Sequence, residues 1–152
     1  MRKKLNLELN LALKSQNKLR LSTIRLINAA IKDRDISVRT DENASGVADD
    51  VIVEILMQMI KQRNDSITHY EEGGRLELAE KETAEINIIK EFLPKQLSEE
   101  EVDVAISRAI EAETARSIRD MGSVIGRLKR EYSGKMDFSK VAPLVKQRLL
   151  RN

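Results

Sequence analysis

Apolar residues recur at every third or fourth position through most of the chain. This spacing places them along one side of an α-helix. No segment shows the sustained alternation of apolar and polar residues, bounded by turn residues, that is typical of β-hairpins. The pattern therefore predicts an all-α fold. Helices are expected over about residues 3–15, 17–36 and 47–72, then from the Gly73-Gly74 pair to about residue 93, with three shorter helices after about residue 98.

The second helix shows how the core is expected to form. Its inward side is predicted to consist of Leu19, Thr23, Leu26, Ile27, Ala30 and Ile31. Polar turn residues from Ser37 to Gly46 predict the longest loop. Gly73-Gly74 stands where a left-handed helix end needs residues without a Cβ.

A domain junction is predicted after the fourth helix. Pro94 is expected to stop that helix. The run Ser98-Glu99-Glu100-Glu101 is the sequence signature of a capping box that starts a new helix. The chain is therefore expected to form an N-terminal helical domain of about four helices at residues 1–94. A C-terminal three-helix bundle is expected at residues 98–152.

Composition narrows the class of protein. Of 152 residues, 41% are hydrophobic but only 3% are aromatic, which indicates a core of aliphatic side chains. No run approaches the roughly 18 apolar residues of a membrane span, and the basic start leads into an amphipathic stretch rather than a signal-peptide core. The chain has no cysteine, which agrees with a reducing compartment. We therefore expect a soluble, cytoplasmic protein with no membrane partner.

Charge is distributed unevenly along the chain. Residues 1–39 carry 10 Lys/Arg and 3 Asp/Glu, residues 40–115 carry 7 and 19, and residues 116–152 carry 10 and 3. Two basic ends thus flank an acidic middle. Clustered positive charge is expected of a surface that binds phosphates. A solvated surface, or basic ends that pair with the acidic middle, would explain the same pattern.

One stretch near the C-terminus concentrates arginine. If it forms a single helix, steps of three and four residues place Arg116, Arg119, Ser123, Arg127 and Arg130 in one stripe. A second face then carries Ile118, Met121, Ile125, Leu128 and Tyr132. Such a helix would anchor to a core and present arginines to an acidic partner.

Glycines in and after this stretch allow two interpretations each. Gly122 and Gly126 are four residues apart, so they would form a smooth patch either for a neighbouring helix or for an RNA backbone. Gly134-Lys135 suits a tight turn between helices, and its lysine could also meet a phosphate. Both alternatives stay open at the level of sequence.

Residues for catalysis or metal binding are scarce. His69 is the only histidine, and no cysteine or second histidine can complete a metal site with it. Glu99, Glu100 and Glu101 are explained by a helix N-terminus. There is no phosphate-binding glycine loop, no dinucleotide fingerprint and no activated serine. We expect no catalytic residue, no metal and no cofactor.

Four stretches together carry a family resemblance. They are Lys18 to Ile27 with Ala29 to Lys32; Met59 to Arg63 with Asp65, Ser66 and Tyr70; Glu91 to Pro94 with Gln96 to Ser98; and Met121 to Gly126 with Gly134 to Phe138. In order and spacing the chain resembles the YqeY-like proteins of the GatB/YqeY family over essentially its whole length.

The resemblance implies a C-terminal tail similar to that of the B subunit of tRNA-dependent amidotransferases. That enzyme converts glutamate or aspartate mischarged on tRNA to the amide with glutamine as nitrogen donor, and its tail helps to hold the tRNA. The tail's signature positions would be Gly122, Val124, Gly126, Gly134 and Lys135. Nothing in this chain resembles the enzyme's catalytic parts, so a family label of carbon–nitrogen ligase activity need not describe it. Pro143 departs from the family pattern and is expected to kink the last helix or shift its start.

Three hypotheses follow. The first is a non-catalytic accessory protein in translation that binds tRNA or another structured RNA and has a possible protein partner in aminoacyl-tRNA metabolism. Its phosphate contacts would be Arg116, Arg119, Arg127, Arg130 and Lys135. The second is a helical protein-interaction module. The third is a participant in glutamine-dependent amide transfer.

Overall fold

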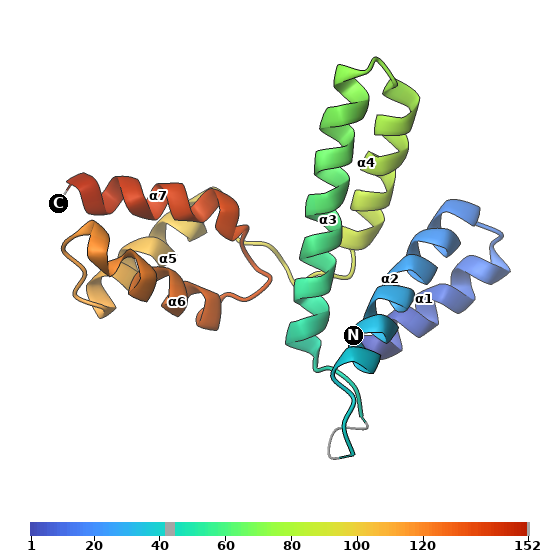
Figure 1. Ribbon diagram of the computed structural model, residues 1–152, viewed down its shortest axis with the longest axis horizontal. Helices are drawn as coiled ribbons and strands as arrows, with labels where there is room; N and C mark the ends of the chain where they lie inside the picture. The colour runs from blue at the N-terminus through green and yellow to red at the C-terminus, as the bar shows by residue number, and fades with distance from the viewer. Residues whose placement is uncertain (42–44, 152) are drawn as a thin grey trace. The chain divides into compact units, whose positions relative to one another are not determined.

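The computed structural model describes residues 1–41 and 45–151 (Figure 1). Over these residues the protein contains seven α-helices, one short 3-10 helix and no strand. The prediction of an all-α fold is therefore confirmed. The chain divides into two compact units, Met1–Leu93 and Pro94–Asn152. Part of the expected 37–46 loop, at positions 42–44, lies outside the described residues.

Four helices build the first unit. They are α1 (Arg2–Lys14), α2 (Lys18–Ser37), α3 (Asp49–Glu72) and α4 (Leu76–Lys90). Helix α1 packs along α2, and α3 and α4 form a long hairpin (Figure 1). Their shared core contains Leu5, Ala12, Ile24, Ile27, Ile31, Ile52, Ile55, Leu56, Met59, Ile89 and Phe92. The burial of these aliphatic side chains is the main force that holds the helices together.

The α3–α4 hairpin extends beyond this core. Where the core ends, Arg63 on α3 donates from Nε to Oε2 of Glu85 on α4 at 3.0 Å. Both side chains are nearly buried, at 13% and 10% exposure. At the tip, Gly74 adopts a φ of +70°, and the Arg75 N–H donates to the Tyr70 carbonyl. This confirms a left-handed helix end, although only the second glycine of the pair adopts it.

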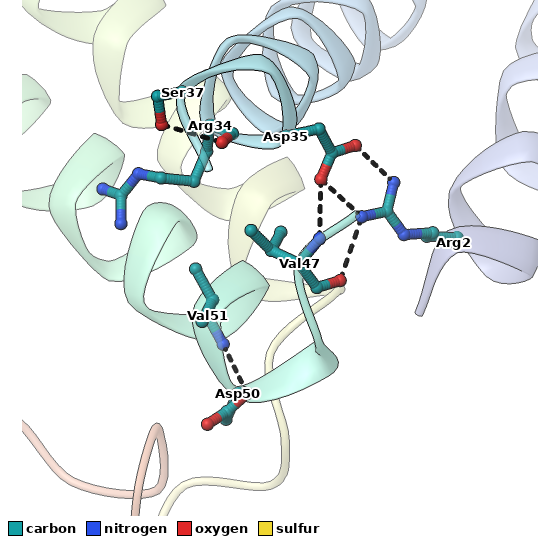
Figure 2. A network of polar contacts seen from close by, with 7 residues as sticks. All are labelled: Arg2, Arg34, Asp35, Ser37, Val47, Asp50 and Val51. Atoms are coloured by element: carbon teal, nitrogen blue, oxygen red, sulfur yellow. Dashed lines mark hydrogen bonds and ion pairs between the residues drawn. The ribbon is translucent and has the colours of Figure 1, made fainter. Parts of the chain in front are cut away.

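A latch joins α1, the end of α2 and the segment before α3 (Figure 2). Arg2 forms a two-pronged pair with Asp35, at 2.9 and 2.8 Å, and also donates to the Val47 carbonyl. The Val47 N–H donates to the same carboxylate. These donors hold the pKa of Asp35 below its usual value of 3.8, because they stabilise the charged form. A Cβ on Gly46 would lie 2.7 Å from Asp35 Oδ1, so the latch requires glycine there.

Two details of the first unit differ from the sequence predictions. Leu26 was expected in the core but is 48% exposed, because Ile24 takes the inward position on α2. Helix α4 ends at Lys90 rather than near Leu93. Its last residues tighten into bonds over three residues, as in the Phe92 N–H to Ile89 carbonyl bond, before Pro94.

Three α-helices and one 3-10 helix build the second unit. They are α5 (Glu99–Ala112), η1 (Ile118–Asp120), α6 (Met121–Glu131) and α7 (Phe138–Arg151). The core contains Ala105, Ile106, Ala109, Ala115, Val124, Leu128, Met136, Val141, Val145 and Leu149. Ser98 and Glu101 form the expected capping box at the start of α5. Helix α7 begins at Phe138 and continues through Pro143.

The first residues of the second unit are fastened to the turn between α6 and α7. The Leu97 N–H donates to the Lys135 carbonyl at 2.8 Å. The Gln96 side-chain amide donates to the carbonyls of Pro94 and Gly134. Gly134 has a φ of +74°, which lets this turn present both carbonyls.

Candidate nucleic-acid interface

The arginine-rich stretch is not one helix. Helix α5 ends where Thr114 adopts a φ of +49°, and the Ala115 N–H then bonds to the Ile110 carbonyl. Ala115 becomes buried in the core, so the chain must turn before α6 begins at Met121. The expected five-residue stripe is therefore wrong as a helical feature. Arg116 precedes the helix, and Arg119 lies on the 3-10 turn.

Asp120 fixes the geometry of this turn. Its carboxylate accepts the backbone N–H groups of Arg116, at 2.9 Å, and Ser117, at 3.2 Å. These bonds lower the pKa of Asp120, because they stabilise the ionised form. Ser117 and Asp120 thus form a capping box, which belongs to η1 rather than directly to α6.

The outward face of α6 is smooth and basic. Val124 and Leu128 are fully buried and define its inward side. Two residues turn a helix by about 200°, so positions 122, 126 and 130 face away from the core. A Cβ added to Gly122 or Gly126 would meet no atom within 4 Å. Within the described residues, no helix of the second unit therefore packs against these glycines.

The cations around this face differ in their partners. Arg127 is engaged on both sides, with Nη1 3.2 Å from Glu113 and Nε 3.1 Å from Glu131. Such exposed pairs contribute at most about 1 kcal/mol, so a phosphate could displace them at small cost. Within the described residues, the side chains of Arg116, Arg119, Arg130 and Lys135 are exposed and make no ion pair.

The other signature positions have structural roles. Val124 is a core residue, Gly134 supplies the turn that holds Gln96, and the Lys135 backbone accepts from Leu97. The side chain of Lys135 is exposed.

Sequence reasoning passed over one cation on α6. Lys129 is exposed, and its Nζ lies 5.9 Å from the centre of the Phe138 ring. Lys129 lies three residues after Gly126 and next to Arg130, and this helical spacing could have placed it on the outward face. Arg148, by contrast, is engaged with Asp103 at 2.6 Å and with Ser107 on α5. It therefore ties α7 to α5.

Over positions 1–41 and 45–151, no group of three or more His, Asp or Glu side chains could hold a metal ion. No helix within those positions is long and apolar enough to cross a membrane. The arrangement that stands out is an exposed cationic face without large side chains along its centre.

A family model described as Yqey-like protein matches residues 2–149. The chain belongs to the YqeY-like family.

Several curated fungal proteins are similar to this YqeY-like chain. The altered inheritance of mitochondria protein 41, mitochondrial, of Lachancea thermotolerans is 31% identical over 105 residues, 68% of this chain and 54% of that protein. The protein of the same name from Pyrenophora tritici-repentis is 27% identical over 135 residues, 87% of this chain and 71% of that protein. The matched region is thus about half the length of the Lachancea relative. The expectation of a cytoplasmic location stays a prediction, since these relatives are named mitochondrial.

Many residues in the four YqeY-like stretches hold the fold together. Arg20 bridges Glu8 on α1, at 2.7 Å, and Glu91 after α4. Arg63 joins α3 to α4 through Glu85, and Gln96 fastens the start of the second unit. Residues of these stretches that remain exposed and unpaired are therefore the better candidates for function.

Proposed function

We propose that this YqeY-like protein is a non-catalytic accessory protein that binds tRNA or another structured RNA through the second unit. The observation that supports this most is the outward face of α6, where Gly122 and Gly126 leave open space beside the unpaired Arg130. Arg119 and Lys135 lie in the segments that enter and leave the same helix.

The physical basis is close approach combined with charge. Glycine in a helix costs about 1 kcal/mol relative to alanine, and no neighbouring helix within the described residues offsets that cost at these positions. A glycine surface lets a sugar-phosphate backbone come near, and unpaired arginines then contact its phosphates. Such contacts give affinity with little sequence specificity. Only 3% of the residues are aromatic, so few side chains can stack on unpaired bases, which favours structured RNA.

The relation to amidotransferases belongs to the same proposal. The likeness of the second unit to the tail of the B subunit suggests tRNA as the ligand and a partner in aminoacyl-tRNA metabolism. The amidotransferase's catalytic chemistry would then reside in that partner and not in this chain.

Fluorescence anisotropy of labelled, folded tRNA across a salt series tests the proposal. The tail variant carries Arg119→Gln, Arg130→Gln and Lys135→Gln, which removes three unpaired cations. The matched control carries Lys61→Gln, Arg75→Gln and Lys81→Gln, three exposed cations of the α3–α4 hairpin. Both variants lose the same charge, so long-range attraction falls equally.

The tail variant should bind more weakly than the control, and its affinity should depend less on salt, by about 0.7–0.9 in logarithmic slope for each lost phosphate contact. Equal binding by the two variants would contradict the proposal. If the wild-type protein and both variants all fail to bind tRNA while the tail variant still retains a protein partner, that result would favour a protein-interaction module instead.

A further inference from the structure

Helix α2 has an outward side that plays no part in the fold. Thr23, Ile27 and Ile31 are buried on its inward side. Arg25 stands two residues from both Thr23 and Ile27, about 200° around the helix. Seven residues complete nearly two turns, so Lys18 and Lys32 share the side of Arg25. All three are exposed, and Ser22 and Ala29 between them are exposed as well.

These three cations have no acidic partner within the described residues, unlike Arg2 and Arg20 of the same unit. Arg2 is held by Asp35, and Arg20 by Glu8 and Glu91. On the outward side, Lys18, Arg25 and Lys32 form no ion pair. Their charge is thus available to a ligand.

The cations are evenly spaced, and the exposed side chains between them are small. Successive cations are about 10.5 Å apart along the helix, at 1.5 Å per residue. Ser22 and Ala29 are exposed in the intervening turns, Leu21 is partly buried against the core, and the exposed Leu26 lies to one side. A protein partner would need a buried anchor there, whereas a phosphate backbone needs only a row of accessible charges.

We propose that the outward face of α2, formed by Lys18, Arg25 and Lys32 with Ser22 and Ala29, is a second contact surface for the phosphate backbone of structured RNA. The protein then holds its RNA with both units. The proposal extends the one above, since the ligand is the same RNA, but the α2 surface and the α6 surface share no residue. Joining two weak contacts through one chain raises the overall affinity without any new interaction.

The test adds one protein to the tRNA anisotropy series. The α2 variant carries Lys18→Gln, Arg25→Gln and Lys32→Gln, and the control remains Lys61→Gln, Arg75→Gln and Lys81→Gln. Glutamine has nearly the helix propensity of lysine and arginine, so the fold should persist. Circular dichroism and urea unfolding of the full-length variants verify that.

The α2 variant should reduce the logarithmic salt slope by about 2–3 relative to the control and weaken binding at least about 10-fold near 0.1 M salt. An α2 variant that matches the control overturns this inference and leaves the tail result untouched. A tail variant that matches the control, while the α2 variant binds weakly, overturns the proposed function but supports the α2 surface. If no protein binds tRNA even at low salt, both fail.

Discussion

Arg63 and Arg130 are the same residue type in two different settings. Arg63 lies nearly buried between two helices, with its guanidinium 3.0 Å from a carboxylate that is itself almost inaccessible. Arg130 extends from α6 into solvent and makes no ion pair within the described residues. The first is a component of the fold, whereas the second remains available to a ligand. Charge patterns in sequence count both alike, so the basic and acidic blocks overstate the charge that is free to act.

Glycines show the same division. Gly46 is crowded by the Arg2–Asp35 pair and has a left-handed backbone, whereas Gly122 and Gly126 face open space. The first glycine is needed by the structure. The other two lower the stability of helix α6, and no contact within the described residues offsets that cost.

The substitution Arg63→Met should have the largest effect on stability. Glu85 would remain nearly buried without its main partner, so the free energy of unfolding should fall by about 3 kcal/mol. Urea unfolding measures this. Arg130→Met is the companion and should change stability by less than about 0.5 kcal/mol. Similar losses at the two arginines would show that the fold does not distinguish them.

Gly46→Ala should have the next largest effect. The new Cβ would clash with Asp35 and Arg2, and the left-handed φ of +88° adds strain. A loss of about 2 kcal/mol in thermal or urea unfolding is expected. Gly74→Ala serves as the control, because it shares a left-handed φ but has nothing within 4 Å. A cost no greater than that of the control would mean that the clash is relieved.

The double change Gly122→Ala with Gly126→Ala should stabilise the protein by roughly 0.5–1 kcal/mol per position, because alanine favours the helix and both sites are open. The same change should weaken tRNA binding, since a methyl group would separate the backbones. A higher free energy of unfolding together with a weaker tRNA affinity in anisotropy would identify a binding face. Unchanged affinity would leave the glycines without a ligand role.

The smallest effect concerns pH. The pKa of Asp35 is lower in the folded chain than its ordinary 3.8, so this carboxylate stabilises folding above that value. The contribution disappears as the pH falls through the folded pKa. The stability difference between the native protein and Asp35→Asn, below about 1 kcal/mol, should therefore be constant from pH 7 to about 5 and shrink below about pH 4. A difference that grew on acidification would contradict the latch.

Sequence periodicity was enough for the helices and for much of the core. It could not place Leu26, because a helix face about 100° wide admits either Leu26 or Ile24, and packing against α1 and α4 decides between them. The capping box at Ser98 was recognisable because its two bonds are local.

The candidate site was harder to foresee. The break before α6 depends on Thr114 in a left-handed conformation, which residues other than glycine and asparagine seldom adopt. Nor could sequence show that Arg127 lies between Glu113 and Glu131, since Glu113 lies at the C-terminal cap of α5, outside α6. Pairing across helices is a tertiary property, and it decides which cations remain available.

The bonds from Gln96 and Leu97 to the Gly134–Lys135 turn have a practical consequence for dissecting the molecule. A fragment cut at Ser98 would keep every helix of the second unit, yet it would leave two carbonyls of that turn without their donors. A fragment that begins at Pro94 keeps the donors of both bonds. A fragment that isolates the second unit should therefore begin at Pro94, five residues before α5.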